Sequence, residues 1–222
     1  LLILAPIGGQ SLATGSGGVT NSFSTTPRHP NYSLSWTQGV HYGEPGTGGV
    51  VISSSSLTAV KDLFSEVVTG PGRAETPVVA AVDYWNTYAS NSLAGARVRV
   101  LATTHGLGGA ELNAIDEGTA SFSNLVAHIQ GAASLATSSN WVLNVPVWFF
   151  VHGENDTFLE TPVENYRTNF LIMYERMNTI AKAASGQTND PVVVMTQTAS
   201  RTYENQSNSW TANAQLFLNL SD

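Results

Sequence analysis

The feature that most constrains the fold is a regular alternation of short apolar runs with longer amphipathic stretches. Four apolar runs, each bounded by Gly, Pro, Asn or Ser, predict central strands at residues 1–7, 98–103, 147–151 and 192–197. The stretches between them predict helices at residues 57–68, 78–89, 118–136 and 162–184. Such alternation is typical of a mostly parallel sheet with crossover helices. We therefore expect an α/β protein, a three-layer α/β/α sandwich around one central sheet.

Capping signals flank two of the expected helices. Ser56 is a candidate N-cap for the first helix, and Gly70 is a stop signal after it. Thr161 and Glu164 form a capping box at the start of the last helix, with Pro162 at the first helical position. We expect both helices to begin at these signals.

The remaining stretches carry weaker patterns. The segment 13–55 is rich in Gly, Ser and Thr and has no sustained period, so we expect a long loop insertion after the first strand. Residues 214–220 are expected to begin a further helix. A chain of 222 residues can build one α/β domain with a single large core, and we expect one domain over residues 1–222.

Composition limits the partners and the setting. A net charge of -7, with no cluster of Lys and Arg, argues against binding nucleic acid. The chain has no cysteine, which excludes disulfides and thiolate metal sites. No run approaches the roughly 20 apolar residues that cross a bilayer, so membrane insertion is not expected. A charged fraction of only 11%, with many Ser, Thr and Asn residues, favours a secreted, cell-surface or virion-associated protein.

Three of the four strand ends carry groups suited to chemistry. Ligands of open parallel sheets bind at the carboxyl ends of the strands, so the residues just after each strand are the candidates. These runs are Gly8-Gly9-Gln10-Ser11, His105-Gly106-Leu107-Gly108-Gly109 and His152-Gly153-Glu154-Asn155-Asp156. Each run alone is a weak signal, because glycine and serine are common turn residues. Their order along the chain is more informative than any one of them.

Taken in order, Gly-Gln-Ser, Gly-Leu-Gly-Gly and Gly-Glu-Asn-Asp resemble blocks one, two and three of the SGNH hydrolases. The similarity is greatest to the branch of sialate O-acetylesterases and acetylxylan-esterase-like proteins, and it covers residues 1 to about 196. It implies a flavodoxin-like sandwich, a serine esterase without a cofactor or a metal, and an acylated carbohydrate as substrate. His152 stands where the branch usually has Gln, which we interpret as a difference in the substrate pocket.

The resemblance assigns roles to particular residues. It makes Ser11 the nucleophile, and it places three oxyanion donors: the backbone N–H of Ser11, the N–H of Gly108 or Gly109, and the side chain of Asn155. Ser11 alone would more often be a turn residue, and the two glycines could serve packing alone.

Further residues near these strand ends are expected to bind the substrate. Gln10, His105, His152 and Glu154 are expected there, Glu154 by orienting its block through hydrogen bonds. The alternative for both histidines is a satisfied, partly buried side chain. Asp156 is expected to be structural.

A serine esterase also needs a base, which the family supplies in a late Asp-x-x-His block. This sequence contains no Asp-x-x-His. We expect that block to lie beyond residue 222, in a longer polypeptide. Two alternatives are a non-catalytic glycan-binding or virion structural domain derived from such an esterase, and rescue by His105 or His152.

Two other reaction classes are less favoured by the residues. A metal site built from His152, Glu154 and Asp156 ranks third, after the esterase and the non-catalytic domain, because the sequence offers no second ligand cluster. Glycosidase chemistry needs an opposed pair of carboxylates, and no such pair stands out in the sequence.

Overall fold

The computed structural model describes residues 1–15, 26–42, 44, 50–63, 76–92, 98–196 and 214–215. The strands are β1 (Leu2–Gly9), β2 (Ser33–Trp36), β3 (Val60–Asp62), β4 (Arg99–Thr104), β5 (Leu143–Asn144), β6 (Val147–Val151) and β7 (Val192–Thr196). The helices are α1 (Pro77–Ser92), α2 (Ala120–Ser138), α3 (Glu154–Phe158) and α4 (Val163–Ser185), with short 3-10 turns η2 (Ser54–Ser56) and η3 (Leu112–Ala114).

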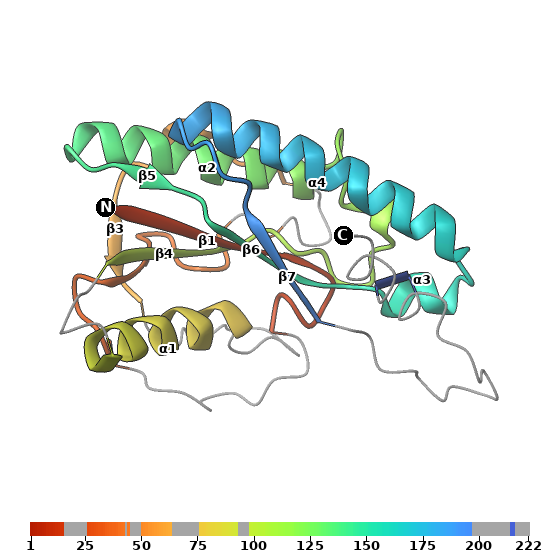
Figure 1. Ribbon diagram of the computed structural model, residues 1–222, viewed down its shortest axis with the longest axis horizontal. Coiled ribbons are helices and arrows are strands. Elements are labelled where there is room, and N and C mark those ends of the chain that lie inside the picture. The colour runs from red at the N-terminus through yellow and green to blue at the C-terminus, as the bar shows by residue number, and fades with distance from the viewer. Residues whose placement is uncertain are drawn as a thin grey trace.

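The strands form one sheet in the order β3-β2-β4-β1-β6-β7, with β5 also paired to β1. Every pairing is parallel except that of β2 with β3, which is antiparallel. Helices α2 and α4 lie together along one face of this sheet, and α1 covers the other (Figure 1). The mixed α/β architecture, with a mostly parallel central sheet flanked by helices, is therefore confirmed.

The central strands β1, β4 and β6 are buried on both faces, which explains why apolar residues run almost without a break along them, whereas β7 at the edge is partly exposed. Along β1, Leu2 and Leu4 point into the core beneath α2 and α4, while Ile3, Ala5 and Ile7 point into the core beneath α1. This alternation follows from the two-residue period of a strand. The central strand therefore contributes to both cores, and its carboxyl end is fixed from both sides.

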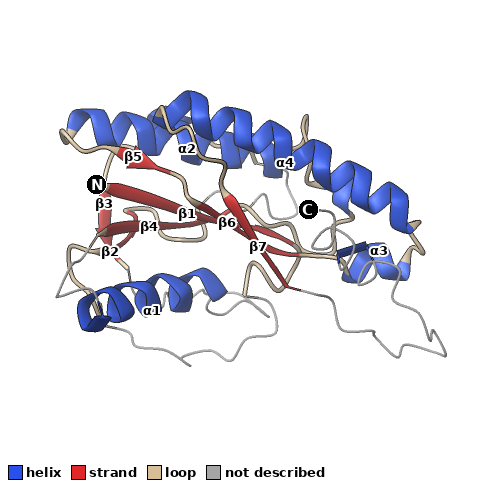
Figure 2. Cartoon of the chain, in the orientation of Figure 1, coloured by secondary structure: helices blue, strands red, loops and turns tan. Residues whose placement is uncertain are grey.

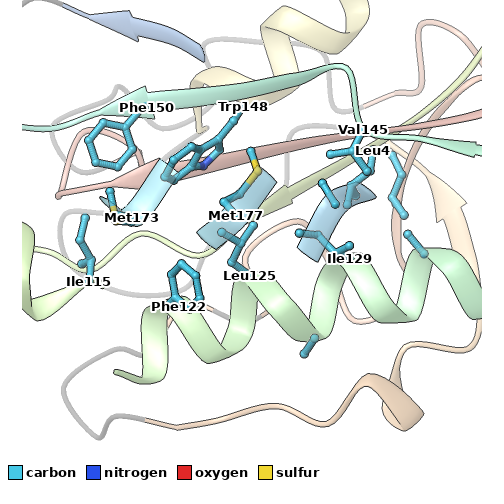
Figure 3. Packing of buried hydrophobic residues seen from close by; sticks show 14 of the residues in the cluster. Leu4, Ile115, Phe122, Leu125, Ile129, Val145, Trp148, Phe150, Met173 and Met177 are labelled. Carbon is cyan, nitrogen blue, oxygen red and sulfur yellow. The ribbon is translucent and has the colours of Figure 1, made fainter. Parts of the chain in front are cut away.

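The larger core lies between the sheet and the pair α2 and α4. Figure 3 shows Trp148 and Phe150 of β6 facing Met173 and Met177 of α4, with side chains of α2 closing the layer. Trp148 and Phe150 are completely buried, and their ring centroids are 5.0 Å apart in a tilted arrangement. Buried aromatic pairs of this kind hold β6 firmly against the helices. No helix in the described part of the chain is long and apolar enough to cross a membrane.

Most of the expected elements are confirmed. The four apolar runs are the strands β1, β4, β6 and β7, although residue 197 lies outside the described part. The helices expected at 78–89, 118–136 and 162–184 are α1, α2 and α4.

The helix expected at 57–68 is wrong for the residues that the structure describes. Ser53, and not Ser56, caps a short 3-10 turn that ends before Leu57, and β3 then pairs with β2. Edge pairing satisfies the backbone groups of β2 and overrides the local helical spacing. Residues 64–70 lie outside the described part.

Two further expectations need correction. The segment 13–55 is not loop throughout, because β2 lies inside it and pairs with β4. The capping box at the start of α4 does not form. The helix has Pro162 at its N-cap without a side-chain cap, and the Thr161 hydroxyl instead donates to Asp156 Oδ1 at 3.1 Å. The Thr161 hydroxyl therefore points to a buried carboxylate, with which it makes a charge-assisted hydrogen bond, and not to the N–H groups at the helix start.

Candidate active site

The order of the strands places the candidate site. The chain leaves β1 toward β2 on one side and returns through β4, and it then crosses to β6 on the other side of β1. The carboxyl ends of β4, β1 and β6 therefore lie side by side at the point where the direction of winding reverses. In open α/β sheets this is the place where ligands bind. The three predicted motifs follow these three strands.

The first motif bends the chain sharply at the end of β1. Gly9 has φ +126°, and a Cβ added there would overlap the Val151 carbonyl oxygen of β6. Only glycine fits this close approach. Gln10 N then donates to the same Val151 oxygen at 2.9 Å, and Ala13 N donates back to Gln10 O at 3.0 Å. Ser11 therefore lies in a tight turn at the strand end, where its side chain is half-buried.

The second motif lies against the first. Leu107 N donates to Gly9 O at 2.9 Å, which ties the loop after β4 to the end of β1. A Cβ added to Gly108 would lie 3.9 Å from Ser11 Cβ, so Gly108 lies beside Ser11. Gly109 has φ +69° and is exposed, with no described atom within 4 Å of a Cβ added there. Of the two glycines, Gly108 is the one placed beside the serine.

The third motif follows β6 and begins α3. Gly153 stands at the N-cap of α3 with φ +126°, and Asn155 is the second residue of this short helix. The side chain of Asn155 is half-buried. Its side-chain amide makes no hydrogen bond within the described part of the chain. Figure 2 shows α3 at the end of the sheet where β1 and β6 finish. Asn155 is therefore presented at the same sheet end as Ser11.

The Gln10 side chain joins the first motif to the third. It is 3% exposed, and its Oε1 accepts from Gly153 N and Glu154 N, both at 2.8 Å. Asn155 N lies 3.5 Å from the same oxygen. The Gln10 carbonyl oxygen is thus occupied by the backbone of the third motif. Its expected contact with substrate stays a prediction.

Asp156 fastens the third motif to the loop after β4. Its Oδ2 accepts from Leu112 N at 3.0 Å, while its Oδ1 accepts from Thr161 Oγ1. Burial raises the pKa of Asp156 to about 6, although both hydrogen bonds oppose the shift. These contacts agree with the structural role expected for this residue.

All five histidines lie in the described part of the chain, and none of them contacts Ser11. His29 is hydrogen-bonded to Thr87, His41 to Glu44, His105 to Trp148, His128 to Trp36, and His152 to Tyr166. Among the described residues, no side chain makes a hydrogen bond to the Ser11 hydroxyl. None of these histidines is therefore placed to act as a base for Ser11, whose role as nucleophile stays a prediction.

His105 and His152 are buried beneath the site. Their exposed fractions are 2% and 1%. Burial lowers the pKa of each imidazole to about 3, so both rings are neutral near pH 7 and weak as bases. Rescue of catalysis by either residue is disfavoured on this ground. Their contact with substrate stays a prediction. Their hydrogen-bond partners are Trp148 and Tyr166, and His152 Nε2 also lies 3.7 Å from Asp156 Oδ2.

Glu154 and its neighbours do not assemble into a metal site. Because residues 154–158 are helical, Glu154 and Asp156 point to different sides of α3, unlike alternate residues on a strand. No group of three or more His, Cys, Asp or Glu side chains suited to a metal occurs within the described residues. Glu154 Oε2 is buried without a hydrogen bond there, so its expected orienting role stays a prediction.

The motifs did not indicate two residues that hold His152 in place. Tyr166 of α4 is completely buried and is bonded to His152 Nδ1 at 3.0 Å. Gln215 Nε2 donates to the His152 carbonyl oxygen at 2.8 Å. Tyr166 lies in the core with the apolar face of α4, and the spacing of that face does not indicate which polar group its hydroxyl meets. Contacts between segments so far apart in sequence leave no local signal.

Three solved structures share this fold. A protein from Arabidopsis thaliana aligns with a TM-score of 0.56 at 14% identity, over 99% of this chain and 95% of that one. NanS aligns with a TM-score of 0.61 at 14% identity, over 98% of this chain and 74% of NanS. A carbohydrate acetylesterase from Xanthomonas citri aligns with a TM-score of 0.54 at 14% identity, over 98% of this chain and 47% of that protein.

No protein-family model matches the sequence, and no curated protein matches it. The similarity is therefore one of structure at low identity. It shows that this chain shares the fold of these proteins, a mostly parallel central sheet flanked by helices.

Proposed function

We propose that this domain is a serine esterase that removes acyl groups, chiefly O-acetyl groups, from carbohydrate, with Ser11 as the nucleophile. The observation that carries the proposal is the meeting of Ser11 with Gly108 at the switch point of the sheet, where a Cβ on Gly108 would lie 3.9 Å from that of the serine. A backbone N–H beside a strand-end serine is what acyl transfer requires. The carbohydrate acetylesterase from Xanthomonas citri, which shares the fold, supports the choice of substrate.

The proposed reaction begins with attack of Ser11 Oγ on the ester carbonyl carbon. The carbonyl oxygen then becomes an oxyanion, and the backbone N–H groups of Ser11 and Gly108 and the side-chain amide of Asn155 would donate to it. Collapse of this intermediate expels the sugar hydroxyl and leaves the acyl group on Ser11. Water then attacks the acyl-enzyme and releases the acid.

A base must take the hydroxyl proton of Ser11 and return it to the departing sugar oxygen. His105 and His152 are buried, and none of the five histidines contacts Ser11. We therefore propose that a histidine outside these 222 residues supplies this function. The composition further supports a secreted, cell-surface or virion-associated setting, where acylated glycans are accessible.

Hydrolysis of p-nitrophenyl acetate by the full-length protein tests this function. We expect turnover that is lost in Ser11→Ala, together with labelling of Ser11 by a fluorophosphonate. The matched control is Ser123→Ala, on α2 outside the three motifs, which should leave turnover unchanged. A full-length protein without esterase activity, or activity that survives Ser11→Ala, would favour the non-catalytic glycan-binding or virion structural domain instead.

A further inference from the structure

Gln10 contacts the end of β6, the turn that holds Ser11 and the start of α3, each through a different atom. Its backbone N donates to Val151 O at the end of β6, and its backbone O accepts from the turn that holds Ser11. Its side-chain Oε1 accepts from Gly153 N and Glu154 N at the start of α3. One residue beside the nucleophile is therefore bonded to the strand and to the helix that together place Asn155.

The start of α3 depends on this acceptor. The first N–H groups of a helix have no partner within the helix and are usually satisfied by a side chain at the N-cap. Gly153 occupies the N-cap of α3 and has no side chain to serve in this way. Gln10, which follows β1, satisfies the N–H groups in its place. The orientation of this five-residue helix therefore depends on Gln10, the residue before Ser11.

We propose that Gln10 is a positioning residue, which holds Asn155 at the height above Ser11 that the oxyanion requires. This inference rests on the proposed esterase function. Gln10 is 3% exposed and its carbonyl oxygen is engaged by the backbone, so its effect passes through Asn155. An Asn155 amide that is displaced by even part of an ångström contributes less to the transition state. The loss should therefore appear in kcat, while KM changes little.

The test compares Gln10→Met and Gln10→Glu in the full-length protein, with p-nitrophenyl acetate as substrate. Methionine has a similar length but lacks the carbonyl acceptor, whereas glutamate keeps an oxygen there. We expect Gln10→Met to lower kcat about 10²-fold, close to the effect of losing one oxyanion donor, with KM within about threefold. Gln10→Glu should retain most of the activity. If Gln10→Met does not fold, Gln10→Asn, whose oxygen is withdrawn by one methylene, is measured in its place.

A double variant separates positioning from a merely structural role. If Gln10 acts through Asn155, then Gln10→Met should cost little further activity in an Asn155→Ala background. The matched control is Gln187→Met, because Gln187 Oε1 also accepts a backbone N–H, from Val145 at 2.7 Å, but ahead of β6 and away from the three motifs. That variant should leave kcat unchanged. Multiplicative losses in the double variant, or a raised KM with unchanged kcat in Gln10→Met, would overturn the proposal.

A readout without catalysis keeps this inference distinct from the esterase function. The NMR signal of the Asn155 side-chain amide should shift in Gln10→Met and stay in place in Gln187→Met. If Ser11→Ala retained activity, the proposed function would fail, but the placement of Asn155 by Gln10 would still be decided by that signal. An unmoved Asn155 signal in folded Gln10→Met contradicts the positioning role whatever the activity.

Discussion

At the scale of single residues, Asn155 is a donor that the sequence motif indicates and the fold presents. It is half-buried on α3, and no described group accepts a hydrogen bond from its amide. We expect Asn155→Ala to reduce kcat for p-nitrophenyl acetate by about 10²–10³, because one oxyanion donor is lost. Asn169→Ala, which removes an exposed amide bonded to Asn113, is the control and should leave kcat unchanged. Equal kcat in Asn155→Ala and the parent protein would remove Asn155 from the proposed oxyanion hole.

Two glycines with positive φ should respond very differently to alanine. In Gly9→Ala the new Cβ would meet the Val151 carbonyl at φ +126°, so β1 and β6 would have to separate. We expect loss of several kcal/mol of unfolding free energy, or failure to fold. In Gly109→Ala the φ of +69° is strained but the space is open, and the loss should be about 1 kcal/mol. Urea unfolding of both variants measures the difference, and similar losses would contradict the contact at Gly9.

The candidate site residues that the sequence predicts share one property. Each of them belongs to a short motif of neighbouring residues. Ser11, Gly108 and Asn155 each follow a strand end, and the fold gathers those ends. The contacts of Gln10 could not be predicted in this way. Its partners at residues 153 and 154 are more than 140 positions distant, and only the pairing of β1 with β6 brings them within reach.

At the scale of elements, α2 offers a direct test of helix capping. Thr119 has extended backbone geometry, and its side chain accepts from Phe122 N at 3.3 Å. We expect Thr119→Ala to lower the free energy of unfolding by about 1 kcal/mol, since one N–H at the helix start loses its acceptor. Thr137→Ala, at an exposed position near the other end of α2, should change it by less than about 0.5 kcal/mol. If the two variants unfold at the same denaturant concentration, the proposed contribution of the Thr119 cap to stability is wrong.

The elements also show where local patterns stop being informative. The spacing of Leu57 and Val60 suits a helix, yet residues 60–62 are a strand. The reason is tertiary: Val60 pairs with Trp36, and Leu63 N donates to Ser33 O at 2.8 Å, so the edge of β2 gains a partner. The long helices α2 and α4 were predictable because each carries a sustained apolar stripe over many turns. Short segments have no such redundancy.

At the scale of the whole molecule, three histidines are completely or almost completely buried, each beside an aromatic residue of the core. His128 is paired with Trp36, His105 with Trp148, and His152 with Tyr166. Burial is the largest cause that lowers the pKa of each, to about 4 for His128 and about 3 for the other two. All three are therefore neutral in the folded protein near neutral pH, and their rings act as aromatic core residues with hydrogen-bonding edges.

These three buried histidines make the stability of the fold sensitive to acid. The unfolded chain binds protons on these histidines below about pH 6.5, whereas the folded chain does so only near pH 3 to 4, so stability falls as the pH drops through that window. At pH 5.5 the loss is of the order of 1 kcal/mol for each histidine. The raised pKa of Asp156, about 6, acts in the opposite direction and offsets about 1 kcal/mol.

Urea unfolding at pH 7 and pH 5.5 measures the balance. We expect the free energy of unfolding to be lower at pH 5.5 by roughly 2 kcal/mol, because the three histidines outweigh the carboxyl groups of Asp156 and Asp83, whose pKa values are both raised by burial. In linkage terms, unfolding in this range should take up about one proton on average. Asp156→Asn, which removes one opposing carboxyl group, should make the acid dependence steeper. A stability that is equal or higher at pH 5.5 would mean that these imidazoles are not desolvated as the fold places them.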